Sequence, residues 1–386
     1  MKKKILALTG IRSEYDLLYP LLKAIDEDKE LELGIIVAGA HLSPLHNFSV
    51  KQIEKDNLPI VERIYNLLYS DSLNAKAKSA AILMQSMTQT LERENPDFLM
   101  VLGDREEAIV GAIVASYMNI PIIHLAGGDH TNPIGGNVDE QVRHATTKLS
   151  HIHFTMREEH TTRILKLGEE SWRVHTVGSG GIDRIRVTPI LTKKELVKAL
   201  GERVLDSYAV VIHHPLNSQV NEGAHELEQI FETLIEENLA IYVGYPNSDP
   251  GFDSLIKVIN KYEEKGKIIT YKNLDRVLFV NLLRNAQVLV GNSSLGLHEA
   301  PYLCLPAINI GERQVGRLSG KNVQFVNADK NEIKRALDRA LKNSTYKEEI
   351  VGSKDIYGDG YMAQKCVEII KKLPNREVVL AKKMEY

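Results

Sequence analysis

The sequence predicts an α/β protein built from two Rossmann-like domains, each with a parallel sheet. Short apolar runs alternate with longer amphipathic segments, a pattern typical of parallel strands joined by crossover helices. A stretch with three glycines and a proline, at 178–192, interrupts this rhythm. With 386 residues, the chain is also longer than a single hydrophobic core usually requires. We therefore expect one domain over residues 1–182 and a second over 183–386.

Six strands are expected in the first domain. The apolar runs that predict them lie at 4–9, 31–39, 98–104, 120–127, 151–155 and 173–178. Amphipathic segments that predict helices lie between several of these runs, at 14–28, 74–94 and 105–119. Pro96 and Pro121 each stand just before a strand, where a preceding helix has to end.

The second domain repeats the pattern. Its expected strands lie at 208–215, 239–246, 267–272, 286–294, 305–311 and 323–328, with helices at 223–238 and 330–343. Ligands of open parallel sheets bind beyond the carboxyl ends of the strands, so a cleft between two such domains is the expected site. The last helix, expected at 361–372, is a candidate to cross back onto the first domain.

Composition and charge narrow the function classes. The formal net charge is −3, so no global basic field favours nucleic acid as a partner. Cys304 and Cys366 are too few for a disulfide framework, which fits a reducing, cytoplasmic location. No run of about 18 apolar residues occurs, so we expect no transmembrane helix and no membrane partner.

Polar residues directly after the strands of the first domain are the first functional candidates. Arg12 and Ser13 follow the first strand, and Asp104 and Arg105 follow the apolar run FLMVL. Turn formation and helix capping explain Ser13 and Asp104 as well as a functional role does. Arg12 requires an anionic partner at a helix start, which a substrate phosphate would provide.

The most polar and glycine-rich stretch of the chain is AGGDHTNPIGGNVDEQVRHATTKLSH. It carries three carboxylates, those of Asp129, Asp139 and Glu140. Arg143 and His144 lie three and four residues after Glu140, so on a helix they share its face. A solvated charged face is the alternative. Carboxylates beside histidine or arginine suit proton transfer, because such neighbours hold two acids in different protonation states.

Three loops of the second domain carry further candidates. His213 and His214 end one strand, and alternation sends them to opposite faces, so at most one faces the cleft. Asn247 lies after another strand, in a segment that turn formation also explains.

The stretch GNSSLGLHEAP, which follows a third strand, predicts an anion site. Ser293 and Ser294 begin an expected helix with Glu299 inside it, and the free N–H groups of a helix start attract anions. A helix N-cap is the alternative interpretation. Arg313 and Arg317 follow the next strand and would complete a diphosphate pocket.

Other chemistries have less support in the sequence. The chain lacks a Walker glycine-lysine loop, a full dinucleotide fingerprint and a Gly-x-Ser-x-Gly elbow. His151 and His153 share one face of an expected strand, but no third ligand stands at metal spacing, so we expect no metal.

Together, several of these motifs resemble the UDP-N-acetylglucosamine 2-epimerase family, specifically its hydrolysing branch. They are TGIRSEYD, LGDREE, GGD with GNVDEQVRHATTKLSH, HHP, PNSD, and GNSSLGLHEAP with PAINIGERQVGR. The match runs in order along nearly the whole chain. It implies a glycosyltransferase-B-like fold, with the sugar facing the first domain and UDP held mainly by the second.

The resemblance also implies roles for individual residues. The acidic positions implicated in catalysis match Asp104, Asp129 and Glu140, and further candidates are Asp139, Arg143 and His144. Positions lining the nucleotide-sugar cleft match Arg12, Ser13 and Arg105. The UDP contacts match His214, Asn247, Ser293, Ser294, Glu299 and Arg313. The chain departs from the family on the sugar side, with Ala126 where Glu or His is common, Asp129 where Glu is frequent, and a longer insert HTNPIG.

The activity implied is release of UDP and an N-acetylmannosamine-type sugar, a precursor of sialic-acid-like nonulosonates. No redox or other cofactor is required. Two enzyme alternatives stay open: the substrate is UDP-2,4-diacetamido-2,4,6-trideoxyglucose, or the enzyme is non-hydrolysing. A glycosyltransferase and a non-catalytic nucleotide-sugar sensor are the other classes. We expect a homo-oligomer, a dimer or a tetramer.

Overall fold

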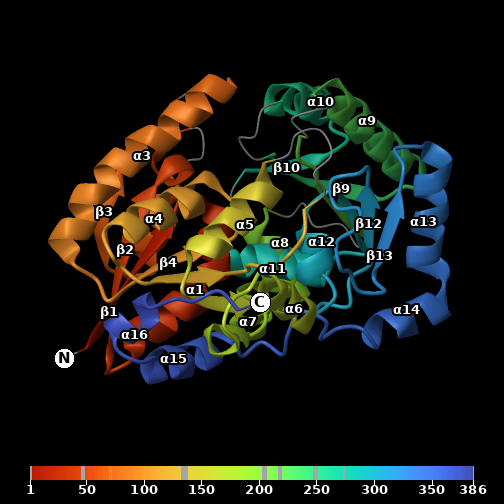
Figure 1. Ribbon diagram of the computed structural model, residues 1–386. Helices are drawn as coiled ribbons and strands as arrows, with labels where there is room; N and C mark the ends of the chain where they lie inside the picture. The colour runs from red at the N-terminus through yellow and green to blue at the C-terminus, as the bar shows by residue number, and fades with distance from the viewer. Residues whose placement is uncertain are drawn as a thin grey trace. The chain divides into compact units, whose positions relative to one another are not determined.

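The computed structural model describes residues 2–44, 48–68, 70, 72–131, 138–201, 207–215, 220–246, 251–272 and 274–385 (Figure 1). The chain divides into two compact units. Unit 1 comprises residues 1–129, 138–184 and 358–386, and unit 2 comprises residues 130–137 and 185–357. The predicted boundary after residue 182 falls within the helix α7 (Gly180–Val187).

Unit 1 is built around a seven-stranded sheet in the order β3-β2-β1-β4-β5-β6-β7, with every neighbouring pair parallel. The strands are β1 (Lys3–Thr9), β2 (Leu31–Ala38), β3 (Ile60–Ile64), β4 (Phe98–Leu102), β5 (Ile122–Leu125), β6 (Ile152–Thr155) and β7 (Val174–Thr176). This sheet and its crossover helices are the Rossmann-like architecture that the sequence predicts.

Helices cover both faces of this sheet (Figure 1). They are α1 (Arg12–Glu27), α2 (Val50–Lys55), α3 (Leu73–Glu94), α4 (Glu106–Tyr117), α5 (Asp139–Leu149), α6 (Glu158–Lys166), α15 (Met362–Lys372) and α16 (Arg376–Leu380). In β1, Ile5 and Ala7 pack with α1 and α15, while Leu6 and Leu8 pack with α3 and α4. The central strand is therefore buried on both faces, as expected for a parallel sheet.

Unit 2 repeats this architecture with a six-stranded parallel sheet in the order β10-β9-β8-β11-β12-β13. Its strands are β8 (Tyr208–Ile212), β9 (Ala240–Gly244), β10 (Ile269–Tyr271), β11 (Val288–Gly291), β12 (Ala307–Ile310) and β13 (Val323–Val326). Its helices are α8 (Lys193–Ala199), α9 (Val220–Glu236), α10 (Phe252–Glu264), α11 (Arg276–Arg284), α12 (Leu295–His298), α13 (Lys330–Lys342) and α14 (Ser344–Val351).

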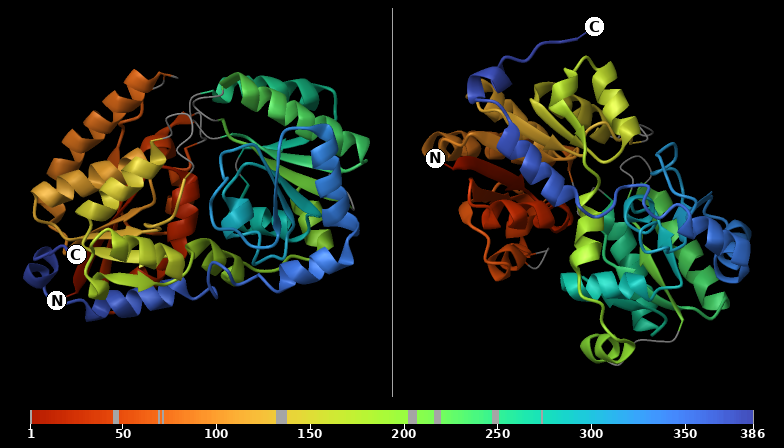
Figure 2. Two further views of the ribbon diagram at one scale, coloured as in Figure 1. Left: turned by 45° about the vertical axis from the view of Figure 1, so that its right-hand side comes forward. Right: turned by 90° about the horizontal axis from the view of Figure 1, so that it is seen from below.

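The C-terminal helix α15 belongs to unit 1, where it lies beside α1 (Figure 2). Asp183 caps its N-terminus by accepting hydrogen bonds from the backbone of Met362, at 2.9 Å, and Ala363, at 2.8 Å. Lys3 caps its other end by donating to the carbonyls of Ile370, Lys371 and Leu373. These side chains satisfy backbone groups that a helix end leaves unpaired.

The strand β3 was not among the expected elements. Its sequence, IVERI, has two charged residues, and most of its side chains are only half-buried. The strand lies at the edge of the sheet, where such residues are tolerated, so the apolar run that marks a central strand is missing. No helix within the described part of the chain is long and apolar enough to cross a membrane.

Candidate functional site

In unit 1, the loops after β4 and β5 and the start of α5 bring acidic residues to one buried arginine. Arg143 on α5 is 1% exposed. It donates from Nη1 to Glu140 Oε2 at 2.7 Å and forms an ion pair with Asp104 through Nη2. The same Nη1 lies 3.4 Å from the backbone oxygen of Asp129. The structure thus brings together the three predicted acidic residues, and we refer to Arg143, Asp104, Asp129 and Glu140 as the Arg143 cluster.

The electrostatics of the Arg143 cluster favour the charged guanidinium. Burial alone would lower the pKa of Arg143, but the charges of Asp104, Asp129 and Glu140 raise it above its usual value. Glu140 also lies 3.0 Å from His144 Nε2, through its other oxygen. The i, i+3 and i, i+4 spacing predicts this shared helix face. Glu140 therefore sits between a guanidinium and an imidazole, an environment that suits an acid–base residue. Asp139, the first residue of α5, is half-buried.

A neutral histidine fixes the loop that carries Asp104. His124 on β5 is buried, with Nε2 at 2.8 Å from the carbonyl oxygen of Gly103 and Nδ1 at 3.2 Å from Thr147 Oγ1. Burial lowers the pKa of His124 to about 3, so the ring is neutral at physiological pH. Its Nε2–H then donates to Gly103, which has φ +72°, and its Nδ1 accepts from Thr147.

The loop after β5 is held from α6. Arg163 donates to the backbone oxygen of Gly128 at 3.0 Å, and His160 Nε2 lies 3.5 Å from Asp129 Oδ1. Gly128 has φ +74°, and a Cβ there would lie 2.3 Å from the carbonyl oxygen of His160. A residue other than glycine would push the loop away from α6, because backbone atoms cannot yield at that distance. Asp129 is itself 3% exposed, so its carboxylate is fixed rather than solvated.

The remaining candidates of unit 1 lie after β1 and β4. Arg12 Nε lies 3.5 Å from Asp16 Oδ2, and Arg184 Nη1 lies 3.4 Å from the same oxygen, so one carboxylate faces two guanidinium groups. Ser13 is exposed on the first turn of α1. Arg105 occupies the N-cap position of α4 and lies 3.3 Å from Glu107 Oε2. The capping role considered for Asp104 is therefore wrong.

In unit 2, Asn292 connects the loops after β8, β11 and β12. Its side chain accepts from the backbone N–H of His214 and donates to the carbonyl of the same residue, both at 2.8 Å. Its own carbonyl accepts from Arg313 Nη1 at 3.2 Å and from Gln314 Nε2 at 2.9 Å. Asn292 is 1% exposed, so these bonds are shielded from water. His214 and Arg313 are thus brought together through a residue that we did not single out.

The helix expected at GNSSLGLHEAP is shorter than the sequence suggests. The helix α12 spans only Leu295–His298, so Glu299 is its C-cap residue and does not lie inside it. One turn sums few peptide dipoles, which weakens the dipole argument for an anion site. Ser293 accepts from the backbone N–H of Leu295 at 3.3 Å, whereas Ser294, at the N-cap, makes no side-chain cap bond. Both serines are half-buried, and Glu299 is buried.

Other predicted positions have separate environments. Asn247 lies outside the described residues. His213 is buried, with Nε2 2.9 Å from Glu226 Oε2, which leaves His214 as the half-exposed member of the two. Arg317 donates to Gln314 at 2.8 Å. In unit 1, His153 pairs with Glu169 at 3.1 Å. The described residues contain no group of three His, Cys, Asp or Glu side chains that could hold a metal ion.

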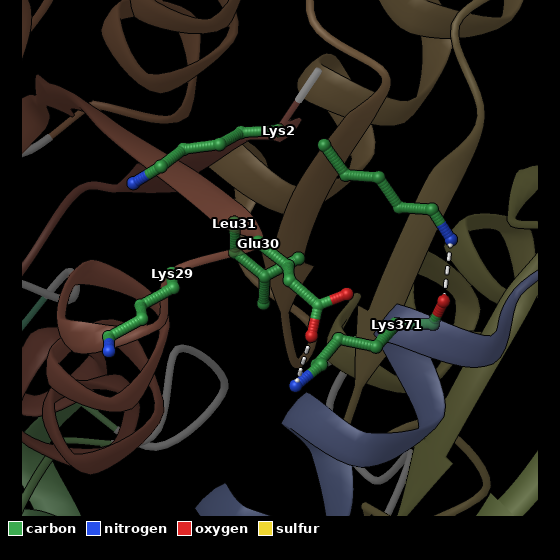
Figure 3. Close-up of a pocket in the computed structure, with 6 residues that line it drawn as sticks. Lys2, Lys29, Glu30, Leu31 and Lys371 are labelled. Atoms are coloured by element: carbon green, nitrogen blue, oxygen red, sulfur yellow. Dashed lines mark hydrogen bonds and ion pairs between the residues drawn. The ribbon is translucent and has the colours of Figure 1, made fainter.

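One pocket of unit 1 lies at the amino ends of the strands, whereas the Arg143 cluster lies at their carboxyl ends. The pocket has a volume of about 410 Å³ and is lined by Lys2, Lys3, Lys29, Glu30, Leu31 and Lys371 (Figure 3). These residues stand at the amino ends of β1 and β2 and at the end of α15. Lys371 is neutralised by Glu30 at 2.7 Å and by Asp28 at 3.4 Å. We do not assign the site to this pocket, because ligands of such sheets bind at the carboxyl ends of the strands.

Sequence reasoning missed several residues that organise these loops: His124, Thr147, His160, Asn292 and Gln314. His124 was visible only as part of an apolar strand, and Gln314 has no motif of its own. Asn292 offered a signal, since a Gly-Asn pair directly after a buried strand marks a backbone that another group approaches closely. A Cβ on Gly291 would lie 2.1 Å from the carbonyl oxygen of Ile212.

Comparisons with known structures support the same fold. The chain superimposes with a TM-score of 0.77 on UDP-GlcNAc 2-epimerase from Methanocaldococcus jannaschii in complex with UDP-GlcNAc and UDP, at 20% identity, covering 96% of this chain and 99% of that one. A Neisseria meningitidis UDP-GlcNAc 2-epimerase bound to UDP-GlcNAc gives 0.71 at 18% identity, covering 96% and 100%. This likeness confirms the predicted glycosyltransferase-B-like fold class.

Sequence comparison defines the family. The family model described as UDP-N-acetylglucosamine 2-epimerase matches residues 23–371. A Legionella pneumophila protein named UDP-N,N'-diacetylbacillosamine 2-epimerase (hydrolyzing) is 32% identical over 382 residues, covering 99% of each chain. A Campylobacter jejuni GDP/UDP-N,N'-diacetylbacillosamine 2-epimerase (hydrolyzing) is 32% identical over 384 residues, covering 99% of this chain and 98% of the other. The chain therefore belongs to the UDP-N-acetylglucosamine 2-epimerase family of enzymes.

Proposed function

We propose that this protein is a hydrolysing UDP-sugar 2-epimerase, which converts UDP-N-acetylglucosamine and water into UDP and an N-acetylmannosamine-type sugar. The observation that carries the proposal is the Arg143 cluster, in which one buried arginine contacts the carboxylate of Asp104 from the loop after β4, the carboxylate of Glu140 on α5 and the backbone oxygen of Asp129. The full-length relatives named as hydrolysing 2-epimerases support the same reaction.

The chemistry requires a base, an acid and a stabilised leaving group. The base removes the proton from carbon 2 while the bond from carbon 1 to the diphosphate breaks, which gives UDP and an unsaturated glycal. Water then adds its hydroxyl to carbon 1, and a proton is delivered to carbon 2 from the opposite face. We assign these proton transfers to Asp104, Asp129 and Glu140, since proton transfer in each direction needs positioned groups of opposite protonation.

The Arg143 cluster gives its acids different surroundings. Asp104 and Glu140 contact the permanent cation, whereas the carboxylate of Asp129 lies 3.5 Å from His160 Nε2. Glu140 also contacts His144, through which it can exchange a proton. The reaction consumes water and changes no net oxidation state, so it requires no redox cofactor.

We assign UDP binding to unit 2, through His214, Asn247, Ser293, Ser294, Glu299 and Arg313. The network around Asn292 supports this assignment, because the backbone of His214 and the guanidinium of Arg313 both bond to that one residue. Arg313 supplies positive charge for the diphosphate, whose stabilisation is the main electrostatic task of the step. In unit 1, we propose that Arg12, Ser13 and Arg105 also contact the nucleotide sugar.

A second substrate, UDP-2,4-diacetamido-2,4,6-trideoxyglucose, is favoured by a specific observation. The two relatives that align over 99% of this chain are named for N,N'-diacetylbacillosamine, which is this diacetamido sugar. An Escherichia coli relative named polysialic acid biosynthesis protein P7 is 33% identical but aligns with 87% of this chain. Either product suits a pathway to sialic-acid-like nonulosonates.

The test is incubation of the purified protein with each UDP-sugar, followed by quantification of free UDP and of the sugar product. Free UDP with a 2-epimerised free sugar is expected for one of the two substrates. A UDP-linked 2-epimer would instead identify a non-hydrolysing enzyme. Tight UDP-sugar binding without turnover would identify a sensor. The proposed homo-oligomer is tested separately. Light scattering measures the molar mass of the protein as it elutes from a size-exclusion column.

A further inference from the structure

Two glutamates outside the Arg143 cluster are buried together in unit 1, at the carboxyl ends of β1 and β4. Glu14 on α1 is 7% exposed, and Glu107 on α4 is 3% exposed. Glu14 Oε2 accepts a hydrogen bond from the backbone of Gly10 at 2.9 Å. A Cβ on Gly10 would lie 1.9 Å from Glu107 Oε1, and one on Gly39 would lie 2.6 Å from the same oxygen. The Glu107 carboxylate is therefore enclosed between the loops after β1 and β2.

Arg105 is the cation that these carboxylates contact. Its Nε lies 3.3 Å from Glu107 Oε2 and 4.0 Å from Glu14 Oε1, and its Nη2 lies 3.4 Å from Glu106 Oε1. One guanidinium thus faces three acids. Glu106 also lies 3.9 Å from Lys76 on α3.

The neighbouring 3-10 turn adds a histidine to this region. His41, in the turn Gly39–Leu42, donates its backbone N–H to the carbonyl of Gly10. Its ring lies 3.1 Å from Thr9 Oγ1 and 2.9 Å from Ser49 Oγ, so both ring nitrogens have hydroxyl partners. Among the described residues, Arg105 and Glu106 are charged groups that act on the pair.

A purely structural role explains only one of the two glutamates. Glu14 is the third residue of α1, and a glutamate there commonly reaches back to the backbone before the helix. Glu107 accepts a hydrogen bond from its own backbone N–H in the first turn of α4, but this local bond does not require its side chain to lie against the loops of two other strands. Burial of a second carboxyl beside the first is costly unless one of them carries a proton.

We propose that Glu14 and Glu107 share one proton at neutral pH, and that this proton determines how much positive charge Arg105 presents to an anionic substrate. Glu107 is on this account a positioning residue, which acts on the substrate through Arg105. This inference rests on the proposed function, because it takes a UDP-sugar as the anionic substrate. The shared proton itself is a property of the free protein.

The protonation behaviour follows from the enclosure. Burial and the charge of Glu107 raise the pKa of Glu14 to about 8, and burial and the charge of Glu106 raise the pKa of Glu107 to about 7. Below this range the pair carries at most one negative charge, which Arg105 balances. When the shared proton leaves, the pair carries two negative charges beside one guanidinium, and the site attracts a diphosphate less strongly. The KM for a UDP-sugar should therefore rise as the pH rises through 7 to 8.

The experiment has a readout that does not depend on activity. The protein is labelled with ¹³C at the glutamate carboxyl carbon, and its NMR spectrum is titrated with and without the double substitution Glu14→Gln, Glu107→Gln. We expect a carboxyl signal that titrates near neutral pH in the wild type and is absent from the double variant. Glu27→Gln, which changes an exposed glutamate on α1, is the matched control and should retain that signal. A spectrum in which every glutamate titrates below about pH 5 would overturn the shared proton.

The kinetic arm measures KM for the accepted UDP-sugar between about pH 6 and pH 9. The wild-type KM should rise about tenfold across this range, whereas the double variant Glu14→Gln, Glu107→Gln, which has no titrating carboxyl in the pair, should show a flat KM. An unchanged rise in a folded double variant would remove the link to Arg105. If no UDP-sugar is turned over while the neutral-pH carboxyl signal is present, the proposed function fails and the shared proton stands.

Discussion

Arg143 and Asp104 are 39 residues apart in the sequence, and their side chains form an ion pair inside unit 1. The pair connects the helix α5 to the loop after β4, and Arg143 bonds Glu140 as well. A guanidinium can contact two carboxylates at once because its donors form a rigid planar fork. This geometry makes Arg143 the organising residue of the acidic cluster.

Asp104→Asn should abolish UDP release while sparing UDP binding. The substitution removes an ionisable oxygen next to Arg143 but keeps the size of the side chain, and we assign UDP binding to unit 2. Loss of one acid–base group costs about 10²-fold to 10⁴-fold in rate. UDP release and UDP binding by calorimetry are the measurements. Asp26→Asn, an exposed carboxylate on α1, is the control. Retained turnover in Asp104→Asn would remove this residue from the mechanism.

Arg143→Lys should lower both stability and activity despite keeping the charge. A lysine cannot bridge Asp104 and Glu140 with its single ammonium, so one half-buried carboxylate loses its partner. Breaking a fully buried ion pair costs about 3–5 kcal/mol, which sets the upper bound for this partly exposed pair. Urea unfolding and UDP release measure the two effects. Arg63→Lys, which changes a surface pair with Glu54, should alter neither. A stable and active Arg143→Lys protein would contradict the bridging role.

Asn292→Ala should weaken UDP binding. The side chain holds the backbone of His214 through two hydrogen bonds, and its removal leaves those buried groups without that partner. A loss of about 1–3 kcal/mol of binding free energy corresponds to a Kd for UDP that is about tenfold to a hundredfold higher. Calorimetric titration with UDP is the measurement. The control is Asn327→Ala, an exposed residue just after β13. An unchanged Kd would argue against the assigned UDP site.

Glu169→Gln should destabilise unit 1 in a pH-dependent way. Burial alone would raise the pKa of Glu169, but hydrogen bonds from His153, Lys148 and Lys382 lower it to about 2. A carboxyl with a lowered pKa stabilises the fold above its unfolded value, 4.5, and this contribution is lost as the pH falls toward 2. The variant should lose about 3 kcal/mol of unfolding free energy at pH 7.

The difference between wild type and Glu169→Gln should shrink between about pH 4.5 and pH 2. Urea unfolding at several pH values measures it. The exposed Glu368→Gln on α15 is the matched control, and it should be neutral at every pH. A gap that is independent of pH would mean that the carboxylate charge is not the stabilising feature.

Most of the fold could be predicted from the sequence, but less of the candidate site could. Central strands such as β1 and β11 are continuous apolar runs, so periodicity finds them. The edge strand β3 was not predicted, because Glu62 and Arg63 interrupt its apolar run. The spacing of Glu140, Arg143 and His144 predicted their shared face, because helix geometry is local.

Contacts that depend on tertiary packing could not be predicted. The pairing of Arg143 with Asp104, and the enclosure of Glu107 by Gly10 and Gly39, join segments distant in sequence. The contact of Arg12 with Asp16 is local, but it was not singled out in the sequence, and the contact of Arg12 with the substrate stays a prediction. The length of α12 was also overestimated, because the helical signal in GNSSLGLHEAP does not show that the helix ends at His298.

The central claim, a hydrolysing 2-epimerisation, is tested most directly in deuterated water. The protein is incubated there with each of the two UDP-sugars, and the released sugar is analysed by mass spectrometry and NMR. We predict free UDP, together with one deuterium at carbon 2 of a free sugar of inverted configuration. Release of a sugar without deuterium at carbon 2, or deuterium incorporation with no free UDP, would contradict it.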